Sequence, residues 1–194
     1  MPTGTTILRP NASNFFTSVG WRSSPLTANN LWYTLVNETP PDGDTTFLWK
    51  SGGRNYNGVH FQNLLNGENP PSSENVTIKS CTIYMNCRDS AYAFPGGHST
   101  ASIEFLGWSP IRPTYYPVTG SYTYISSYWE QRTDGGVLRD ITVADINSAR
   151  CNIGVNLGVG VWFRVTQMYI KVNWETKSTV HIKGGTVLGG CLIK

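Results

Sequence analysis

Apolar and polar residues alternate along most of the chain, and clusters of Gly, Pro, Asn and Asp interrupt the alternating stretches. A period of two is typical of β-strands, and the longer period of helices is nearly absent. The alternation predicts nine strands: Thr5–Leu8, Trp32–Asn37, Thr46–Lys50, Val59–Leu64, Val76–Asn86, Ser99–Leu106, Tyr122–Gln131, Cys151–Leu157 and Trp162–Trp174. At this length, such a pattern favours an all-β fold: a single jelly-roll-like antiparallel β-sandwich.

Turn-forming residues separate these predicted strands. Pro40–Asp44 is predicted to be a tight turn, since proline presets φ and Asp-Gly tolerates positive φ. Ser51–Gly58 is predicted to be a long polar loop, and Pro110–Pro117 a loop that leaves the sheet. One helical turn is predicted at Val143–Ala149, with Thr142 as its N-cap and an acidic residue at the third helical position.

The stretch Trp162–Trp174 has no face that is polar throughout. One parity contains Phe163, Val165, Gln167, Tyr169, Lys171 and Asn173, and the other contains Trp162, Arg164, Thr166, Met168, Ile170, Val172 and Trp174. A strand that is apolar on both sides is typical of the centre of a covered sheet. The pattern therefore predicts a long central strand.

Composition narrows the classes of partner. Of the 194 residues, 14% are charged and 12% aromatic, and the net charge of +3 comes from scattered basic residues. A surface rich in Asn, Ser, Thr and Gly suits contact with proteins or sugars. A nucleic-acid binder would gather its basic residues into a patch, so no nucleic-acid partner is predicted. No apolar stretch approaches the ~20 residues that span a bilayer, so no membrane partner is predicted either.

The N-terminus lacks the basic and apolar regions of a secretory signal, which predicts synthesis in a cytoplasm. The chain has four cysteines, Cys81, Cys87, Cys151 and Cys191, and no two of them are spaced as in a CxxC motif. They are therefore predicted to be reduced, small apolar residues rather than zinc ligands.

Catalytic motifs are not found, and neither a cofactor nor a metal ion is predicted. His60, His98 and His181 lie in separate segments without metal-ligand spacing. Glu104 and Glu130 lie in predicted strands, where they are expected to face solvent or pair with Arg or Lys. We predict that the protein is not an enzyme and has no catalytic residues.

Asp42 and Asp44 flank the predicted Pro40–Asp44 turn. Carboxylates on such a loop can bind calcium. The favoured alternative is an Asx-turn with solvated carboxylates.

The chain is unusually rich in aromatic residues, and seven of them are tryptophans. Most lie in predicted strands, where a tryptophan is more often part of the core than a binding surface. Aromatic residues and arginines in predicted loops are the candidate contact residues: Arg54, Tyr56, Arg112, Tyr115 and Tyr116. The alternative for Tyr115 and Tyr116 is that they pin a long loop to the sheet.

The character of the chain changes after Trp174, which divides it into a β-sandwich domain at 1–175 and a segment at 176–194. This segment has glycine pairs between short apolar runs. It is predicted to be a further hairpin of the domain or an arm that binds a neighbouring subunit, with a disordered tail as the remaining alternative. Its candidate interface residues are apolar: Val180, Ile182, Val187, Leu188, Leu192 and Ile193.

Several segments resemble, in order, a β-sandwich module of tailed bacteriophages. These are Ile7–Ala12, Trp32–Glu38 with the following Pro-Pro-Asp-Gly-Asp-Thr-Thr, Tyr122–Trp129, Val143–Asn147 and Arg164–Val172. The module commonly has Trp-Ala-Asp-Ile-Asn where this chain has Val-Ala-Asp-Ile-Asn, and its final strand reads Arg-Val-Thr-Gln-Val-Tyr-Val-Glu-Val. The resemblance spans about residues 5–174, and the segment after it has no counterpart.

The resemblance implies a structural protein of a phage virion: a capsid decoration protein or an appendage of the head or tail. Its expected partners are other virion proteins and further copies of itself, and its expected location is the virion, after synthesis in the host bacterial cytoplasm. The alternative is a receptor- or carbohydrate-binding module of a tail or fibre, whose aromatic face would bind a host surface glycan.

Overall fold

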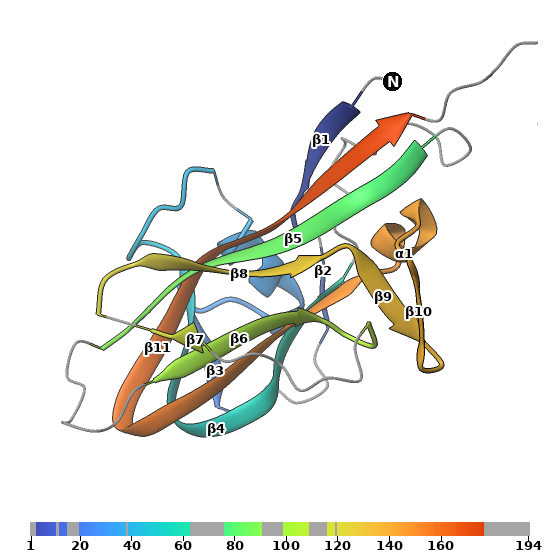
Figure 1. Ribbon diagram of the computed structural model, residues 1–194. Coiled ribbons are helices and arrows are strands. Elements are labelled where there is room, and N and C mark those ends of the chain that lie inside the picture. Colours follow the sequence, from blue (N-terminus) through green and yellow to red (C-terminus); the bar gives the residue numbers. More distant parts are fainter. Residues whose placement is uncertain are drawn as a thin grey trace, which may run out of the picture.

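The computed structural model describes residues 3–10, 12–14, 20–37, 39–62, 76–90, 99–108, 116–118 and 120–176, without the side chains of residues 12–14, 29–30, 53–62, 116–117 and 158–159. The described chain is mostly β-strand (Figure 1). In order, its elements are β1 (Thr3–Leu8), β2 (Ala12–Asn14), β3 (Trp21–Ser24), the 3-10 helix η1 (Asn29–Leu35), β4 (Phe47–Gln62), β5 (Val76–Asp89), β6 (Thr100–Phe105), β7 (Tyr116–Pro117), β8 (Thr123–Trp129), β9 (Gln131–Asp134), β10 (Val137–Asp140), α1 (Val143–Asn147) and β11 (Arg150–Thr176).

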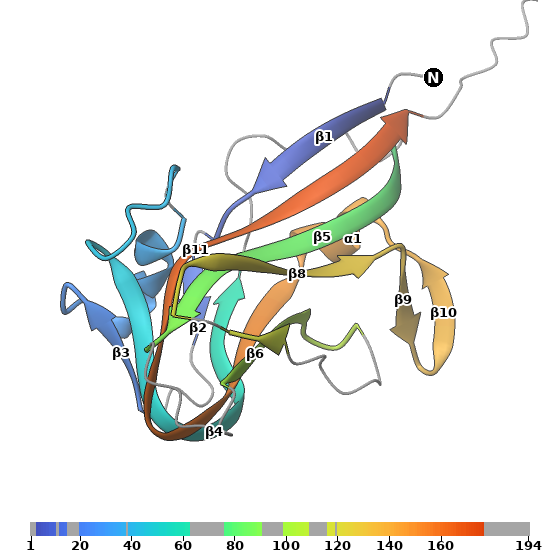
Figure 2. The ribbon, with the colours of Figure 1, turned by 60° about the vertical axis from the view of Figure 1, so that its left-hand side comes forward.

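The long strands β4 and β11 form the frame of the fold. Their antiparallel ladder runs from Arg150 opposite Gln62 to Val165 opposite Leu48, and its register is interrupted twice on the way. Gly52 and Gly160 adopt positive φ near the second interruption. Such irregularities bend a strand pair. Figures 1 and 2 show β4 and β11 curving together, and the two halves of the ladder enter different layers.

The two halves of the β4–β11 ladder pair with different neighbouring strands. In the first layer, β11 from Arg150 to Leu157 lies between β4 and β6, with β2 and β7 at the edges. In the second layer, β11 from Trp162 onward pairs with β5 on one side and with β4 and then β1 on the other. β3 and β8 extend this second layer to the order β3–β4–β11–β5–β8. All pairs are antiparallel, which confirms the predicted class of fold.

Buried apolar residues from both layers form one contiguous core. The most deeply buried members include Phe105, Ile153, Leu48, Ile83, Met85, Phe163, Met168 and Ile170. Phe105 stacks on Trp108 with ring centroids 4.0 Å apart, and Trp21 meets Phe163 edge-on at 6.1 Å. The core therefore lies between the two layers, and the outer sides of the sheets are left for other contacts.

A β-bulge in β11 explains why neither parity of its sequence is wholly polar. The register with β5 shifts between Val165 and Gln167. Before the shift Phe163 and Val165 face the core, and after it Met168 and the alternate residues that follow do so. One extra residue moves the inward positions to the other parity. The predicted central strand is confirmed, and its two-sided apolar pattern comes from this shift.

The predicted helical turn is confirmed as α1, together with its cap. The Thr142 hydroxyl accepts a hydrogen bond from the Asp145 backbone N–H at 3.2 Å, and the Asp145 carboxylate accepts one from the Thr142 N–H at 2.9 Å. This reciprocal capping box satisfies two backbone donors at the start of the helix.

Other predictions of local structure were wrong. Trp32–Asn37 lies largely in η1, because Trp32, Leu35 and Val36 are buried at the spacing of a helical turn. Ser51–Gly58 is not a loop but the bent middle of β4, where the ladder with β11 continues through Gly-rich sequence. The β9–β10 hairpin was not predicted as a separate unit; its turn is formed by two glycines at positive φ, Gly135 and Gly136. Within the described residues, no helix is long and apolar enough to cross a lipid bilayer.

Cys81, Cys87 and Cys151 are free and buried, as expected for small apolar core residues, and Cys191 lies outside the described residues. Burial raises the pKa of Cys81 and Cys151, and burial with the charge of Asp89 raises the pKa of Cys87 to about 12.

We expect the thiols of Cys81, Cys87 and Cys151 to react slowly with iodoacetamide at pH 8 in the native protein and rapidly after unfolding. Mass spectrometry of each cysteine peptide checks this, and rapid labelling of the native protein would contradict it.

Candidate functional site

Four residues on the outward side of the second layer form one row across four strands. Arg22 of β3 lies opposite Trp49 of β4, Trp49 opposite Arg164 of β11, and Arg164 opposite Arg88 of β5. Successive side chains of a strand point to opposite sides. The core positions next to them, such as Leu48 and Val165, therefore leave this row facing outward.

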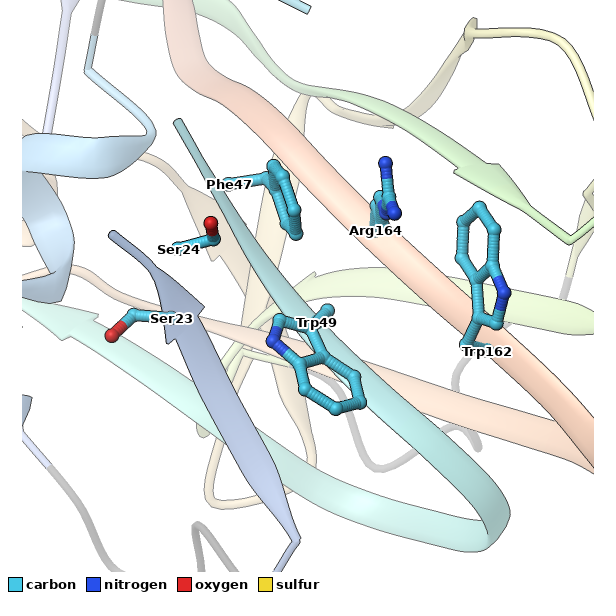
Figure 3. Close-up of a pocket in the computed structure, with 6 residues that line it drawn as sticks. All are labelled: Ser23, Ser24, Phe47, Trp49, Trp162 and Arg164. Atoms are coloured by element: carbon cyan, nitrogen blue, oxygen red, sulfur yellow. The ribbon is translucent and has the colours of Figure 1, made fainter. Parts of the chain in front are cut away.

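Two further aromatic residues, Phe47 and Trp162, extend the row along β4 and β11. Together with Ser23, Ser24, Trp49 and Arg164 they line a shallow hollow of about 380 Å³ (Figure 3). Trp49, Trp162 and Arg164 are half-buried, so each presents part of its surface to solvent. We call the outward surface formed by the following residues the tryptophan–arginine face: Arg22, Asp44, Phe47, Trp49, Arg88, Tyr122, Trp162 and Arg164.

Aromatic rings hold the guanidinium groups of this face in place. The Arg164 guanidinium lies 4.1 Å from the ring centroid of Trp162 and 4.3 Å from that of Phe47, and Figure 3 shows it between the two rings. Arg88 lies 4.7 Å from the Tyr122 ring and 5.4 Å from the Trp162 ring. Arg22 lies 5.5 Å from the Trp49 ring. Cation–π contacts of this kind stabilise a guanidinium and fix its plane.

Asp44, in the turn before β4, joins two of these arginines. Arg88 donates to both of its carboxylate oxygens at 2.7 Å, and Arg164 donates to Oδ1. Tyr122 donates its hydroxyl to Oδ1 at 2.8 Å. Partial burial opposes ionisation, but the hydrogen bonds from Tyr122 and Arg164 and the charge of Arg88 prevail and lower the pKa of Asp44. Asp44 is therefore ionised at neutral pH.

Asp42 does not form the expected Asx-turn, in which its carboxylate would accept a hydrogen bond from the backbone two residues on; its partner is four residues on. Its carboxylate accepts hydrogen bonds from the Thr46 backbone N–H at 3.1 Å and the Thr46 hydroxyl at 2.8 Å. Asp44 also differs from the expected solvated carboxylate, because its oxygens bind two arginines rather than water alone. Among the described residues, no three His, Cys, Asp or Glu side chains are grouped so that they could hold a metal ion.

The same outward side carries a second aromatic group farther along β11. Tyr84 and Tyr169 stack with centroids 4.9 Å apart, and Arg9 lies 5.6 Å from the Tyr169 ring. The Tyr124 hydroxyl donates to Gln167 Oε1 at 2.5 Å, and its ring is 48% exposed. Aromatic rings with polar edges thus extend beyond the hollow.

The contact residues predicted from the sequence are not the residues of this face. Arg54 and Tyr56 belong to the bent middle of β4 and Tyr116 to β7, and their side chains lie outside the described part of the structure. Arg112 and Tyr115 lie outside the described residues altogether. So do the apolar residues predicted for the C-terminal segment: Val180, Ile182, Val187, Leu188, Leu192 and Ile193. These contacts stay predictions.

Sequence reasoning missed Trp49, Trp162 and Arg164 because a tryptophan in a strand was taken as part of the core. The expectation holds for Trp21 in β3, which is buried; Trp32 in η1 and Trp108 after β6 are also buried, but they do not lie in strands. A usable signal was present. Trp162 and Arg164 share a parity opposite to Phe163 and Val165, which places them together on one side of the strand.

The two strand carboxylates considered for catalysis have different surroundings. Glu104 accepts a hydrogen bond from the Asn152 side chain at 2.9 Å, and burial raises its pKa although that hydrogen bond opposes the rise. It neither faces solvent fully nor pairs with Arg or Lys among the described residues, which corrects the expectation for this residue. Glu130 is exposed, as expected, and accepts a hydrogen bond from the Tyr128 hydroxyl at 2.7 Å.

No family model and no curated protein sequence matches the chain. Distant likenesses are found among solved structures. One is TmCBM61, solved with β-1,4-galactotriose (10% identity, TM-score 0.38, 87% of each chain covered). Another is the CBM22-1 xylan-binding domain of Xyn10C from Paenibacillus barcinonensis (11% identity, TM-score 0.37, covering 89% of this chain and 99% of that one). Likenesses with TM-scores this low carry no functional argument for this chain.

Proposed function

We propose that the protein is a carbohydrate-binding module and that the tryptophan–arginine face is its binding surface. The observation that carries this proposal is the hollow in which two half-exposed tryptophans, Trp49 and Trp162, flank Arg164. This is the second of the two functions considered from the sequence, and the geometry of the face favours it.

The face offers what a sugar ring needs. A pyranose has an apolar side made of C–H groups, which an exposed tryptophan ring can cover, and hydroxyl groups that require hydrogen-bond partners. Arg164 supplies N–H donors and Ser24 a hydroxyl group at the edge of the hollow, whereas the Ser23 hydroxyl is already hydrogen-bonded to Thr27. Ligand sites commonly combine such aromatic surface with a few oriented polar groups.

The experiment is a binding screen of the purified protein against an array of neutral and acidic glycans, followed by titration calorimetry with the strongest ligands. We expect saturable binding accompanied by a change in tryptophan fluorescence, because two of the seven tryptophans would contact the ligand. Absence of binding to every glycan of the array would contradict the proposal.

A second candidate function is assembly into a phage virion, which the sequence resemblance implies. One structural observation favours an assembly role. Large apolar side chains are exposed at two places: Leu26, after β3, is 94% exposed, and Val137 and Leu138 in β10 are 68% and 66% exposed. Burying such residues against another subunit would gain about 1.5–3 kcal/mol for each large side chain.

The copy number of the protein in purified particles would test the second candidate. Gel densitometry is expected to find many copies per particle for a decoration protein and few copies for a receptor-binding module of the tail. Absence from purified particles would contradict a virion role of either kind.

The C-terminal segment gives a separate prediction for assembly. Truncation after Glu175 is expected to leave a folded domain and to weaken self-association or attachment to the particle, since the pairs of β11 with β1 up to Glu175, and nearly all of those with β5, are kept. Thermal unfolding and particle binding of the truncated protein measure the two effects. Unfolding on truncation would show an integral hairpin, and unchanged association would rule out the arm.

A further inference from the structure

The charge of the tryptophan–arginine face points to a particular class of glycan. Three guanidinium groups, those of Arg22, Arg88 and Arg164, face outward in one cross-strand row. The tryptophan–arginine face has one carboxylate, that of Asp44. Asp44 engages Arg88 and Arg164. Arg22 makes no ion pair with any carboxylate that the structure describes, and its side chain is exposed.

Arg22 is placed to act together with an aromatic surface. Its guanidinium lies 5.5 Å from the Trp49 ring centroid, and Trp49 lines the hollow. A guanidinium held by a ring loses little freedom when it binds, and its planar fork of N–H donors matches the two oxygens of a carboxylate. A sugar ring lying on Trp49 would bring a carboxylate at its edge within reach of Arg22.

We propose that the ligand is an acidic glycan, whose sugar carboxylate binds Arg22 while a sugar ring packs on Trp49. This inference rests on the proposed carbohydrate-binding function and names its substrate class. The negative charge of Asp44 neutralises one of the two positive charges of Arg88 and Arg164. Arg22 is then the arginine of the row that has no ion pair with a described carboxylate.

Single-stranded nucleic acid is the other anionic polymer that binds aromatic and basic residues. It generally needs a positively charged groove that follows the backbone over several nucleotides. Here the basic residues form a single row around a small hollow, and a half-exposed carboxylate stands beside them. The face therefore fits the isolated carboxylate of a sugar acid better than a phosphate chain.

The test uses the full chain and an array of acidic glycans, each printed beside its carboxyl-reduced neutral counterpart, with a single-stranded oligonucleotide as a third probe. We expect the acidic members to bind more tightly than their neutral counterparts, and binding to weaken as sodium chloride rises from 50 to 500 mM. Arg22→Gln is expected to lower affinity for the acidic glycans about 10- to 100-fold, the loss typical of one charge-assisted interaction, and to lower affinity for their neutral counterparts much less. The matched control is Arg150→Gln, which removes an exposed arginine at the start of β11, in the first layer and away from the tryptophan–arginine face, and is expected to change neither affinity.

Asp44→Asn supplies a change in the opposite direction. It keeps an oxygen acceptor for Arg88 and Arg164 but removes the negative charge, so affinity for acidic glycans is expected to rise. Weaker acidic binding in this variant would contradict the charge argument.

The remaining outcomes separate the two proposals. Preference for neutral glycans, with no effect of Arg22→Gln, overturns the acidic class and leaves carbohydrate binding intact. Failure to bind any glycan overturns both. Tighter binding of the oligonucleotide than of every glycan overturns both and assigns the face to nucleic acid.

Discussion

Replacement of Trp49 and Trp162 together by alanine is expected to lower affinity for the strongest glycan by about 100-fold or more while the domain stays folded. Buried aromatic anchors at the centre of a binding surface commonly contribute about 2 kcal/mol or more each, and every 1.4 kcal/mol is a tenfold change in affinity. Both side chains face outward and lie outside the core cluster. The variant also loses the cation–π contacts of Arg22 and Arg164 with these rings. Each such contact contributes about 0.5–1 kcal/mol at an exposed site.

The matched control for this double variant is Tyr128→Ala. Tyr128 is 60% exposed on β8, and it takes no part in the hollow. We expect its removal to leave glycan affinity unchanged. Titration calorimetry measures affinity, and circular dichroism with thermal unfolding checks the fold of both variants. An unchanged dissociation constant in the double tryptophan variant would move the binding surface elsewhere on the protein.

The largest expected effect on stability comes from Asp145, which ties the β9–β10 hairpin to α1. Asp145 accepts hydrogen bonds from Arg132 at 2.8 Å and from Arg139 at 2.7 Å, in addition to its part in the capping box with Thr142. Its side chain is only 8% exposed. Asp145→Ala is expected to lower the free energy of unfolding by about 3–4 kcal/mol at pH 7, because it leaves a partly buried arginine unpaired and removes a helix cap.

Asp134→Ala is the control for the effect of Asp145, since Asp134 also pairs with Arg139 but is 58% exposed. An exposed pair contributes about 1 kcal/mol at most, so its removal is expected to have a small effect. Urea denaturation of both variants measures the difference. A loss below about 1 kcal/mol for Asp145→Ala would contradict its assigned role.

The effect of Asp145→Ala also depends on pH. Burial opposes ionisation of Asp145, but hydrogen bonds from Arg139 and Thr142 and the charge of Arg132 outweigh it and hold the pKa of the carboxyl well below its usual range. A lowered folded-state pKa gives stability that is present above the unfolded-state value, about pH 3.9, and is lost as the pH falls further. The stability difference between wild type and variant is therefore expected to shrink below about pH 4.

Features that depend on neighbouring residues could be predicted from the sequence. The capping box of α1 needs only Thr142 and the acidic residue three positions later, and both halves of it are present. Most strands follow from local alternation in the same way, and so does the prediction of an antiparallel all-β sandwich. The hydrogen bonds from Thr46 to Asp42 are also local, but they span four residues where an Asx-turn was expected.

Tertiary structure alone decided where the candidate binding surface lies. The row formed by Arg22, Trp49, Arg164 and Arg88 requires strands far apart in the sequence to pair in one register. Register depends on the packing of the whole core, which the sequence of one strand does not contain.

The β-bulge at Thr166 also could not be predicted from the sequence of β11 alone. It shifts the inward positions of β11 from the parity of Phe163 to that of Met168, and so lets one strand present Trp162 and Arg164 to solvent and still fill the core farther along. Alternation within a strand thus determined that the chain forms strands and which residues share a side over short stretches. Which of those sides faces solvent, and which distant residues meet there, was decided by the pairing and bending of β4 and β11, because the cost of leaving core residues in water is settled only when the whole sandwich closes.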